Sequence, residues 1–376
     1  MLKPSDALDD IYQKFTALRA RFDTEIAKLV AELDRPSRNR IAIINATHAA
    51  IEAAMRDYQV FMTHVNAVRL QEEAQAETHQ DMINKRREWG AATAQTNLFR
   101  SEINRWHEVK GLVLQQVKQR RQKLYADETK LPATVTAQLL ASDEVFKWLH
   151  VALNGAQQSE EAIQQSCFPD IGLPNSDFHA HLHAAYRLCL ALKRNKGVRF
   201  LDVGCGGGLK VYSALRYFED AQGFDLEPAY VEASERLFSL DPTAKATVFK
   251  QDALTFEGYD AFDVIYFYRP ISDDAVLHQL EERITSMARP ETVLIAPYIT
   301  FPERFESLGC GRVSGAVYLA QTSQKKADAY RRLAERIGSF VPQPDPPAPH
   351  SIWTPLIEAS RANGYDFPHR HKKARY

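Results

Sequence analysis

A glycine-rich turn at Gly204–Gly208 constrains the fold of this chain more than any other feature of the sequence. It directly follows Arg199–Val203, whose sequence RFLDV is typical of a buried strand, and directly precedes the helical pattern LKVYSALRYF. A tight turn of this kind needs glycine because side chains would block both the backbone geometry and the approach of a ligand. The turn therefore predicts an α/β domain with a ligand site at the carboxyl end of its first strand.

Strands and helices alternate after this turn at the spacing of a parallel sheet. Further strands are expected at 221–224, 246–250, 262–267 and 292–299, with helices at 228–240 and 274–287. Residues 312–314 and 316–321 flank Gly315 with no room for a crossover helix, so they can form only a hairpin. The pattern predicts a doubly wound, mostly parallel seven-stranded sheet with an antiparallel terminal hairpin.

The residues around the turn restrict its ligand. A dinucleotide fingerprint needs glycine at position 209, which is Leu209, and a phosphate-binding loop needs Gly-Lys-Ser/Thr where this chain reads Gly208-Leu-Lys-Val. Asp225 ends the second strand, where a carboxylate can accept protons from ribose hydroxyls. Asp252 follows the third strand, where it can accept from an exocyclic amine. Both acids belong to the carboxyl edge of the sheet, where open α/β folds bind their ligands.

In that order and spacing, the segments FLDVGCGGG, GFDLEP, QDAL and FDVIYF resemble the class I S-adenosylmethionine-dependent methyltransferases. The resemblance covers about 195–322, and it implies that the chain binds S-adenosylmethionine. It also implies a set of cofactor-binding residues. They are Asp202, Gly204, Cys205 and Gly206 for the methionine part, Asp225 and Leu226 for the ribose, and Asp252 and Ala253 for the adenine, with Gly208 as a further cofactor-binding residue of the turn.

The segment after the fourth strand is the place to look for the methyl acceptor. It lacks the Asn/Asp-Pro-Pro-aromatic pattern of amino-methylating DNA enzymes and the Pro-Cys nucleophile of cytosine-C5 enzymes. Tyr268 and Arg269 are the expected catalytic residues: Tyr268 would face the transferred methyl, and Arg269 would hold an acidic acceptor or merely cap the strand. Asp273 and Asp274 are candidate bases or helix N-cap residues, and His278 is a further candidate base.

The histidines of the helix before the first strand admit two interpretations. On a helix His179 and His183 share a face and His181 points away, and no acidic partner follows at helical spacing. We therefore expect no metal site, and the helix is a candidate lid over the cofactor crevice. The basic segment His369–Tyr376 is too short, and too poor in interleaved aromatic residues, to indicate nucleic-acid binding.

The first third of the chain has a helical apolar pattern with few interruptions. Apolar residues recur every three or four positions over 6–34 and again from about residue 39 to 123, which predicts a long-helix bundle or coiled coil. The expected organisation is a helical arm over 1–125, a helical connector and lid over 126–194, the cofactor domain over 195–322, and a C-terminal helix, proline-rich linker and basic tail over 323–376.

Composition leaves the protein class open but excludes several alternatives. The formal net charge of −1 gives no global attraction to nucleic acid or anionic membrane, and no run reaches the roughly 20 apolar residues of a membrane span. The absence of a secretory signal and of CxxC pairs favours a cytoplasmic protein with reduced thiols.

The sequence as a whole predicts a methyltransferase that acts by in-line displacement on an unknown protein, small-molecule, glycan or lipid acceptor. The helical arm would form a homo-oligomer, bind a partner protein or recruit the acceptor. The alternative is a non-catalytic assembly protein whose α/β domain senses the cofactor.

Overall fold

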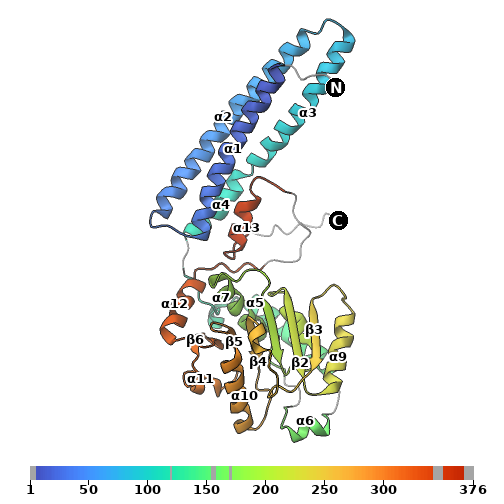
Figure 1. Ribbon diagram of the computed structural model, residues 1–376, viewed down its shortest axis with the longest axis vertical. Coiled ribbons are helices and arrows are strands. Elements are labelled where there is room, and N and C mark those ends of the chain that lie inside the picture. The colour runs from blue at the N-terminus through green and yellow to red at the C-terminus, as the bar shows by residue number, and fades with distance from the viewer. Residues whose placement is uncertain (1–5, 119–120, 154–157, 169–171, 342–349, 368–376) are drawn as a thin grey trace. The chain divides into compact units, whose positions relative to one another are not determined.

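The computed structural model describes residues 6–118, 121–153, 158–168, 172–341 and 350–367. The chain forms two compact units, one made of Met1–Gln119 with Asp345–Tyr376 and the other of Arg120–Pro344. Figure 1 shows the long helices of the first unit and the sheet of the second. No helix within the described ranges is long and apolar enough to cross a membrane.

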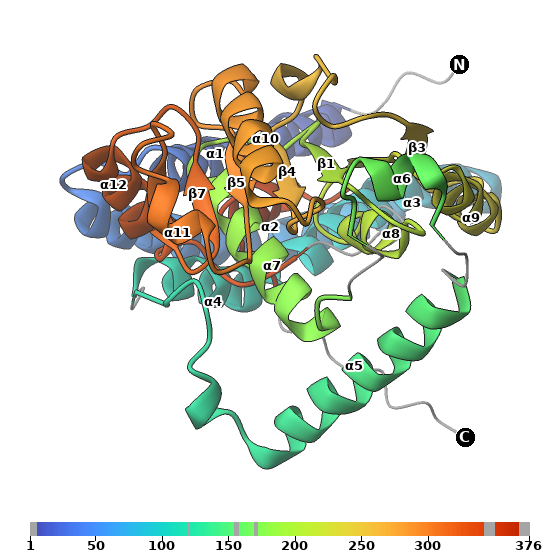
Figure 2. The ribbon, with the colours of Figure 1, turned by 90° about the horizontal axis from the view of Figure 1, so that it is seen from below.

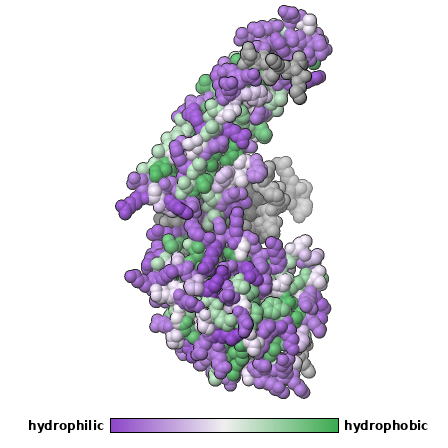
Figure 3. All heavy atoms as spheres, in the orientation of Figure 1, coloured by the Kyte–Doolittle hydropathy of each residue, from purple (hydrophilic) through white to green (hydrophobic). Residues whose placement is uncertain are grey.

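The helical unit is built from four N-terminal helices and one from the C-terminal segment. They are α1 (Asp6–Asp34), α2 (Arg40–Ala74), α3 (His79–Ile103), α4 (Trp106–Val117) and α13 (Thr354–Arg361). The apolar stripe of α1 faces inward, with Phe15 and Phe22 buried against Phe99 of α3. On the face seen in Figure 3 the long helices present mainly hydrophilic side chains. The unit is thus a bundle with an internal apolar core.

The C-terminal segment completes the core of this bundle. Trp353 is fully buried and stacks on Trp106 with ring centroids 5.1 Å apart. Its Nε1 donates to the backbone oxygen of Glu102 at 2.7 Å, and Asn363 Nδ2 donates to the backbone oxygen of Leu33 at 3.0 Å. The expected segment 323–376 is therefore divided: α12 (Gln324–Ala334) belongs to the α/β unit and α13 to the bundle. The unit boundary also falls at residue 119 rather than at 125.

The α/β unit contains the expected seven-stranded sheet, in the order β3-β2-β1-β4-β5-β7-β6. Its strands are β1 (Arg199–Val203), β2 (Asp220–Asp225), β3 (Ala246–Lys250), β4 (Val264–Phe267), β5 (Val293–Ile295), β6 (Gly311–Ser314) and β7 (Val317–Leu319). The first five strands pair in parallel, and β7 runs antiparallel to both β5 and β6. The predicted fold class is confirmed, including the hairpin at Gly315, which has φ +54°.

Helices cover both faces of the sheet, as its alternating side chains require. Phe200 of β1 and Tyr266 of β4 belong to one apolar cluster, whereas their neighbours Leu201 and Phe267 belong to another. The helices and short 3-10 turns of this unit are η1 (Glu128–Lys130), α5 (Ala133–Leu153), α6 (Glu160–Gln164), α7 (Asn175–Ala191), α8 (Leu209–Ala214), α9 (Pro228–Ser239), η2 (Tyr259–Ala261), α10 (Asp274–Met287), α11 (Phe301–Arg304) and α12. Burial on both faces is what makes the strands continuously apolar.

Candidate active site

The glycine-rich turn has the backbone that its composition predicts. Gly204, Gly206 and Gly208 have φ of +75°, +54° and +76°, a region that glycine enters without steric cost. A Cβ on Gly204 would lie 2.7 Å from Cβ of Pro270 in the segment after β4. The turn therefore carries no side chain at Gly204, where the carboxyl ends of β1 and β4 lie side by side. A side chain at this position would occupy the space at this edge of the sheet.

Asp225 and the turn hold each other in place. Oδ2 of Asp225 accepts from the N–H of Gly206 at 2.9 Å, and Oδ1 accepts from the N–H of Glu227 at 2.9 Å. Asp252, which follows β3, accepts from the N–H of Leu254 at 2.8 Å. Each carboxylate is thus fixed by the backbone next to it. Both line one pocket at the carboxyl ends of the parallel strands.

Most of the residues expected to bind cofactor line this pocket: Gly204, Cys205, Gly206, Asp225, Leu226, Asp252 and Ala253. Two others do not. Asp202 is 1% exposed within β1, and Gly208 packs so closely on Ser234 that a Cβ would approach its Oγ to 2.6 Å. These two residues lie outside the pocket lining.

Gln165, Cys167 and Phe168, which belong to the expected connector and lid over 126–194, line the pocket. The N–H of Phe168 donates to the backbone oxygen of Pro270 at 3.0 Å, and the N–H of Ser272 donates to that of Ser166 at 2.7 Å. Cys167 and Ile271 form an antiparallel bridge between these bonds. Residues 158–168 therefore act as a strap, tied along the chain that follows β4.

The other end of the strap is held by charged side chains that follow β2 and end β3. The N–H of Ser159 donates to Glu227 Oε2 at 2.6 Å, and Lys250 Nζ lies 2.8 Å from Glu161 Oε2. Burial opposes ionisation of Glu227, but hydrogen bonds from Ser159 and Ala229 outweigh it and keep the pKa of this carboxyl below its usual range. No local pattern in 158–168 signals these long-range contacts.

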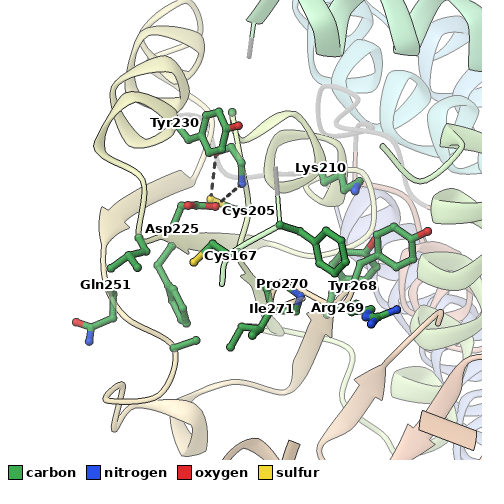
Figure 4. A pocket seen from close by; sticks show the side chains of 18 of the residues that line it. Cys167, Cys205, Lys210, Asp225, Tyr230, Gln251, Tyr268, Arg269, Pro270 and Ile271 are labelled. Carbon is green, nitrogen blue, oxygen red and sulfur yellow. Dashed lines mark hydrogen bonds between the residues drawn. The ribbon is translucent and has the colours of Figure 1, made fainter. Parts of the chain in front are cut away.

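Tyr268 and Arg269 both line the pocket, with Lys210 beside them. Figure 4 shows these three side chains grouped at one end, while Gln251 lies at the other. Lys210 is 9% exposed, and its Nζ lies 5.4 Å from the ring centroid of Tyr268 and 5.6 Å from that of Tyr266. In the sequence, Lys210 stands out only because Gly208-Leu-Lys-Val departs from the pattern of a phosphate-binding loop. A buried ammonium between two aromatic rings makes this end of the pocket suited to an anionic group.

Arg269 is held differently from Lys210. One of its Nη atoms donates to Oδ1 of Asp274 at 3.0 Å, and its guanidinium lies 5.2 Å from the ring centroid of Phe168 in the strap. The neighbouring Asp273 accepts from the N–H of Val276 at 3.0 Å and caps α10. Arg269 thus joins the strap to the start of α10, which gives it a structural role at the pocket mouth.

Of the two cysteines that line the pocket, Cys167 has a thiol that stays protonated at neutral pH. Burial, followed by the charges of Asp225 and Asp252, raises the pKa of Cys167 to about 11. The thiol is therefore protonated under ordinary conditions, and only a thiolate is strongly nucleophilic.

Helix α7, the candidate lid, does not cover the pocket. It packs against β5, β7, α5 and α12 on one face of the sheet. His181 Nδ1 and Tyr125 Oη are hydrogen-bonded at 3.0 Å, and His183 Nε2 lies 3.2 Å from the backbone oxygen of Ser339. Burial lowers the pKa of both His179 and His181 to about 4. The three histidines are neutral packing residues because the interior of the unit excludes their charge.

No protein-family model matches the chain, and no curated protein matches it. Among solved structures it is similar to the amino pentose methyltransferase CalS10 from Micromonospora echinaspora, at 24% identity over 34% of this chain and 53% of that one, with a TM-score of 0.28. It is also similar to an RNA methyltransferase from Salinibacter ruber bound to S-adenosyl-L-homocysteine, at 16% identity over 34% and 76%, with a TM-score of 0.28.

A third similar structure is the N-methyltransferase NodS from Bradyrhizobium japonicum, at 14% identity over 42% of this chain and 83% of that one, with a TM-score of 0.27. The chain spans about half the length of CalS10 and of the sugar N-methyltransferase KedS8, at 53% and 55%. The strand order and the antiparallel seventh strand are those expected from the sequence motifs. None of these matches reaches half of this chain.

Proposed function

We propose that the protein is an S-adenosylmethionine-dependent methyltransferase. The observation that carries the proposal is that three cofactor-binding elements from neighbouring parallel strands line one pocket. The bare turn follows β1, Asp225 ends β2 and Asp252 follows β3. The donor set fits the cofactor because the two carboxylates are fixed hydrogen-bond acceptors and the turn offers backbone without side chains.

The cofactor supplies a methyl group on a positively charged sulfur. The protein's own contribution is to bind and orient. Asp225 would accept from the ribose hydroxyls, Asp252 would accept from the adenine amine, and the turn at Gly204–Gly206 would leave room for the methionine part. Tyr268 borders the space for the acceptor, and the strap over 158–168 shields this end from water. Positioning of this kind accounts for much of the rate of an in-line displacement.

The acceptor stays open among a protein, a small molecule, a glycan and a lipid. Lys210 lies with Tyr268 at one end of the pocket, where its ammonium would bind the carboxylate of the methionine part. The helical unit, with its separate core, would recruit this acceptor or join copies of the chain.

Calorimetric titration with S-adenosylhomocysteine tests the cofactor assignment directly. The wild-type protein is expected to bind it with micromolar or better affinity, and adenosine diphosphate is expected to bind far more weakly. A protein that binds neither S-adenosylhomocysteine nor S-adenosylmethionine would refute the proposed function.

A further inference from the structure

Helix α5 carries a large apolar surface that the α/β unit does not cover. Trp148 is 73% exposed, and Leu140, Val145 and Val151 are each about three-fifths exposed, at 62%, 60% and 61%. Figure 2 shows α5 running along the outside of the unit. Contiguous exposed apolar side chains of this size mark interaction surfaces in soluble proteins.

The opposite face of α5 is fixed to its own unit, so the outward orientation is determined. Asp143 accepts from both the N–H and the hydroxyl of Ser176, at 2.7 Å each. Phe146 is buried, and His150 lines the pocket. With about 100° per residue, Asp143, Phe146 and His150 lie on one side of the helix and Trp148 on the other.

The charges on α5 favour a protein partner over a membrane. Between Ala133 and Leu153 the only basic residues are Lys147 and His150, against the two acids Asp143 and Glu144. Helices that lie in a lipid surface carry a strongly basic polar face. The outward side of α5 lacks this, so lipid is a poor occupant.

The outward side of α5 can pack against the same side of α5 from a second copy when the two helices run antiparallel. Ala137, Ala141, Trp148 and Ala152 fall within an arc of about 60°. If the symmetry axis passes between Glu144 and Val145, each Trp148 lies opposite Ala141 of the second copy. The symmetry produces two such contacts between Trp148 and Ala141, and the pairing of a large with a small side chain allows close packing.

Charge complementarity supports the same arrangement. Glu144 and Lys147 are both exposed and lie toward the same flank of the apolar stripe. In the antiparallel pair, Glu144 of each chain comes beside Lys147 of the other, which produces two equivalent ion pairs. We propose that α5 is a homodimer interface whose occupant is α5 of a second copy of this chain.

Sedimentation velocity on the full chain tests the proposal. The wild type is expected to be a dimer, and Trp148→Glu is expected to be a monomer because a carboxylate would lie against apolar side chains. Leu240→Glu is the matched control, since Leu240 is 81% exposed on another element and should leave the dimer intact. Circular dichroism establishes that both variants are folded.

The results of sedimentation velocity distinguish α5 of a second copy from other partners of this surface. A monomeric wild type would mean that α5 is covered by another protein or by the helical unit of the same chain, and would overturn the proposal. A Trp148→Glu variant that stays dimeric would place the interface elsewhere, such as on the N-terminal helices, and would overturn it equally.

A charge exchange tests the geometry without disturbing the apolar stripe. Glu144→Lys and Lys147→Glu should each weaken the dimer at low salt, because each places like charges together. Mixing the two single variants, or combining both changes in one chain, should restore it. If the mixture and the double variant dimerise no better than the single variants, the antiparallel register is wrong.

Discussion

Asp225 Oδ2 accepts a hydrogen bond from the backbone N–H of Gly206 at 2.9 Å, so the acid that ends β2 also fixes the turn that follows β1. The two parts of the cofactor pocket are therefore mechanically linked. A change at Asp225 acts both on the ribose site and on the shape of the turn that faces the methionine part.

The first prediction follows from this link. Asp225→Ala is expected to weaken S-adenosylhomocysteine binding by about 1–3 kcal/mol, since polar partners would be left unpaired. Asp225→Asn should lose less, because its amide oxygen can still accept from Gly206. Asp260→Ala, at an exposed acid in the same unit, serves as the control in the calorimetric titration. Equal affinities for all three variants would contradict the ribose assignment.

The second prediction concerns the turn itself. Gly204→Ala combines a left-handed backbone with a Cβ placed 2.7 Å from Pro270, so it should cost more than the roughly 1–2 kcal/mol of the backbone alone. Gly309→Ala is the matched control, because Gly309 has φ +69° but its Cβ would meet no atom within 4 Å. Chemical unfolding of both variants measures the difference. The contact with Pro270 carries no cost if the two variants are equally stable.

The third prediction separates the two cations of the pocket. Lys210→Met is expected to lower S-adenosylhomocysteine affinity about tenfold or more, because hydrogen bonds to charged groups contribute about 1.5–3 kcal/mol. Methylthioadenosine, which lacks the carboxylate, should bind the variant and the wild type alike. Arg269→Met should change neither affinity greatly, since Arg269 is paired with Asp274. Equal weakening of both ligands by Lys210→Met would indicate a purely structural role.

The fourth prediction concerns pH. Burial lowers the pKa of His181 to about 4 from its ordinary value of 6.5, so between these values the unfolded chain binds more protons than the folded one. The free energy of unfolding of the α/β unit should therefore fall as pH drops from about 6.5 to about 4. His181→Leu should flatten this dependence. Denaturant titrations at several pH values across that range measure the free energy of unfolding and so test this prediction.

The fifth prediction tests the independence of the two cores. Trp353→Ala removes a fully buried ring from the helical unit and should destabilise that unit by about 3–5 kcal/mol. Affinity for S-adenosylhomocysteine should be unchanged, because Trp353 belongs to the apolar core of the helical unit. Limited proteolysis and calorimetric titration of the same sample provide both measurements. Loss of cofactor binding would mean that the units fold as one.

The sequence by itself determined the features that depend on neighbouring residues. The glycines of the turn are required by local φ values, and the strands are set by short apolar runs. Asp225 and Asp252 could be placed together because the carboxyl ends of parallel strands meet at one edge of a sheet. The hairpin at Gly315 followed from the lack of room for a crossover.

Only the tertiary structure decided the contacts between distant segments. Residues 166–168 pair with 270–272 through backbone groups, which every sequence possesses, so no side-chain pattern signals the strap. The burial of α7 depends on what packs against it, and its histidines are neutral for that reason. Trp353 joins the N-terminal helices across more than two hundred intervening residues. The position of Lys210 between two tyrosine rings likewise depends on β4 lying beside β1, a relation that side-chain packing establishes only in the folded chain.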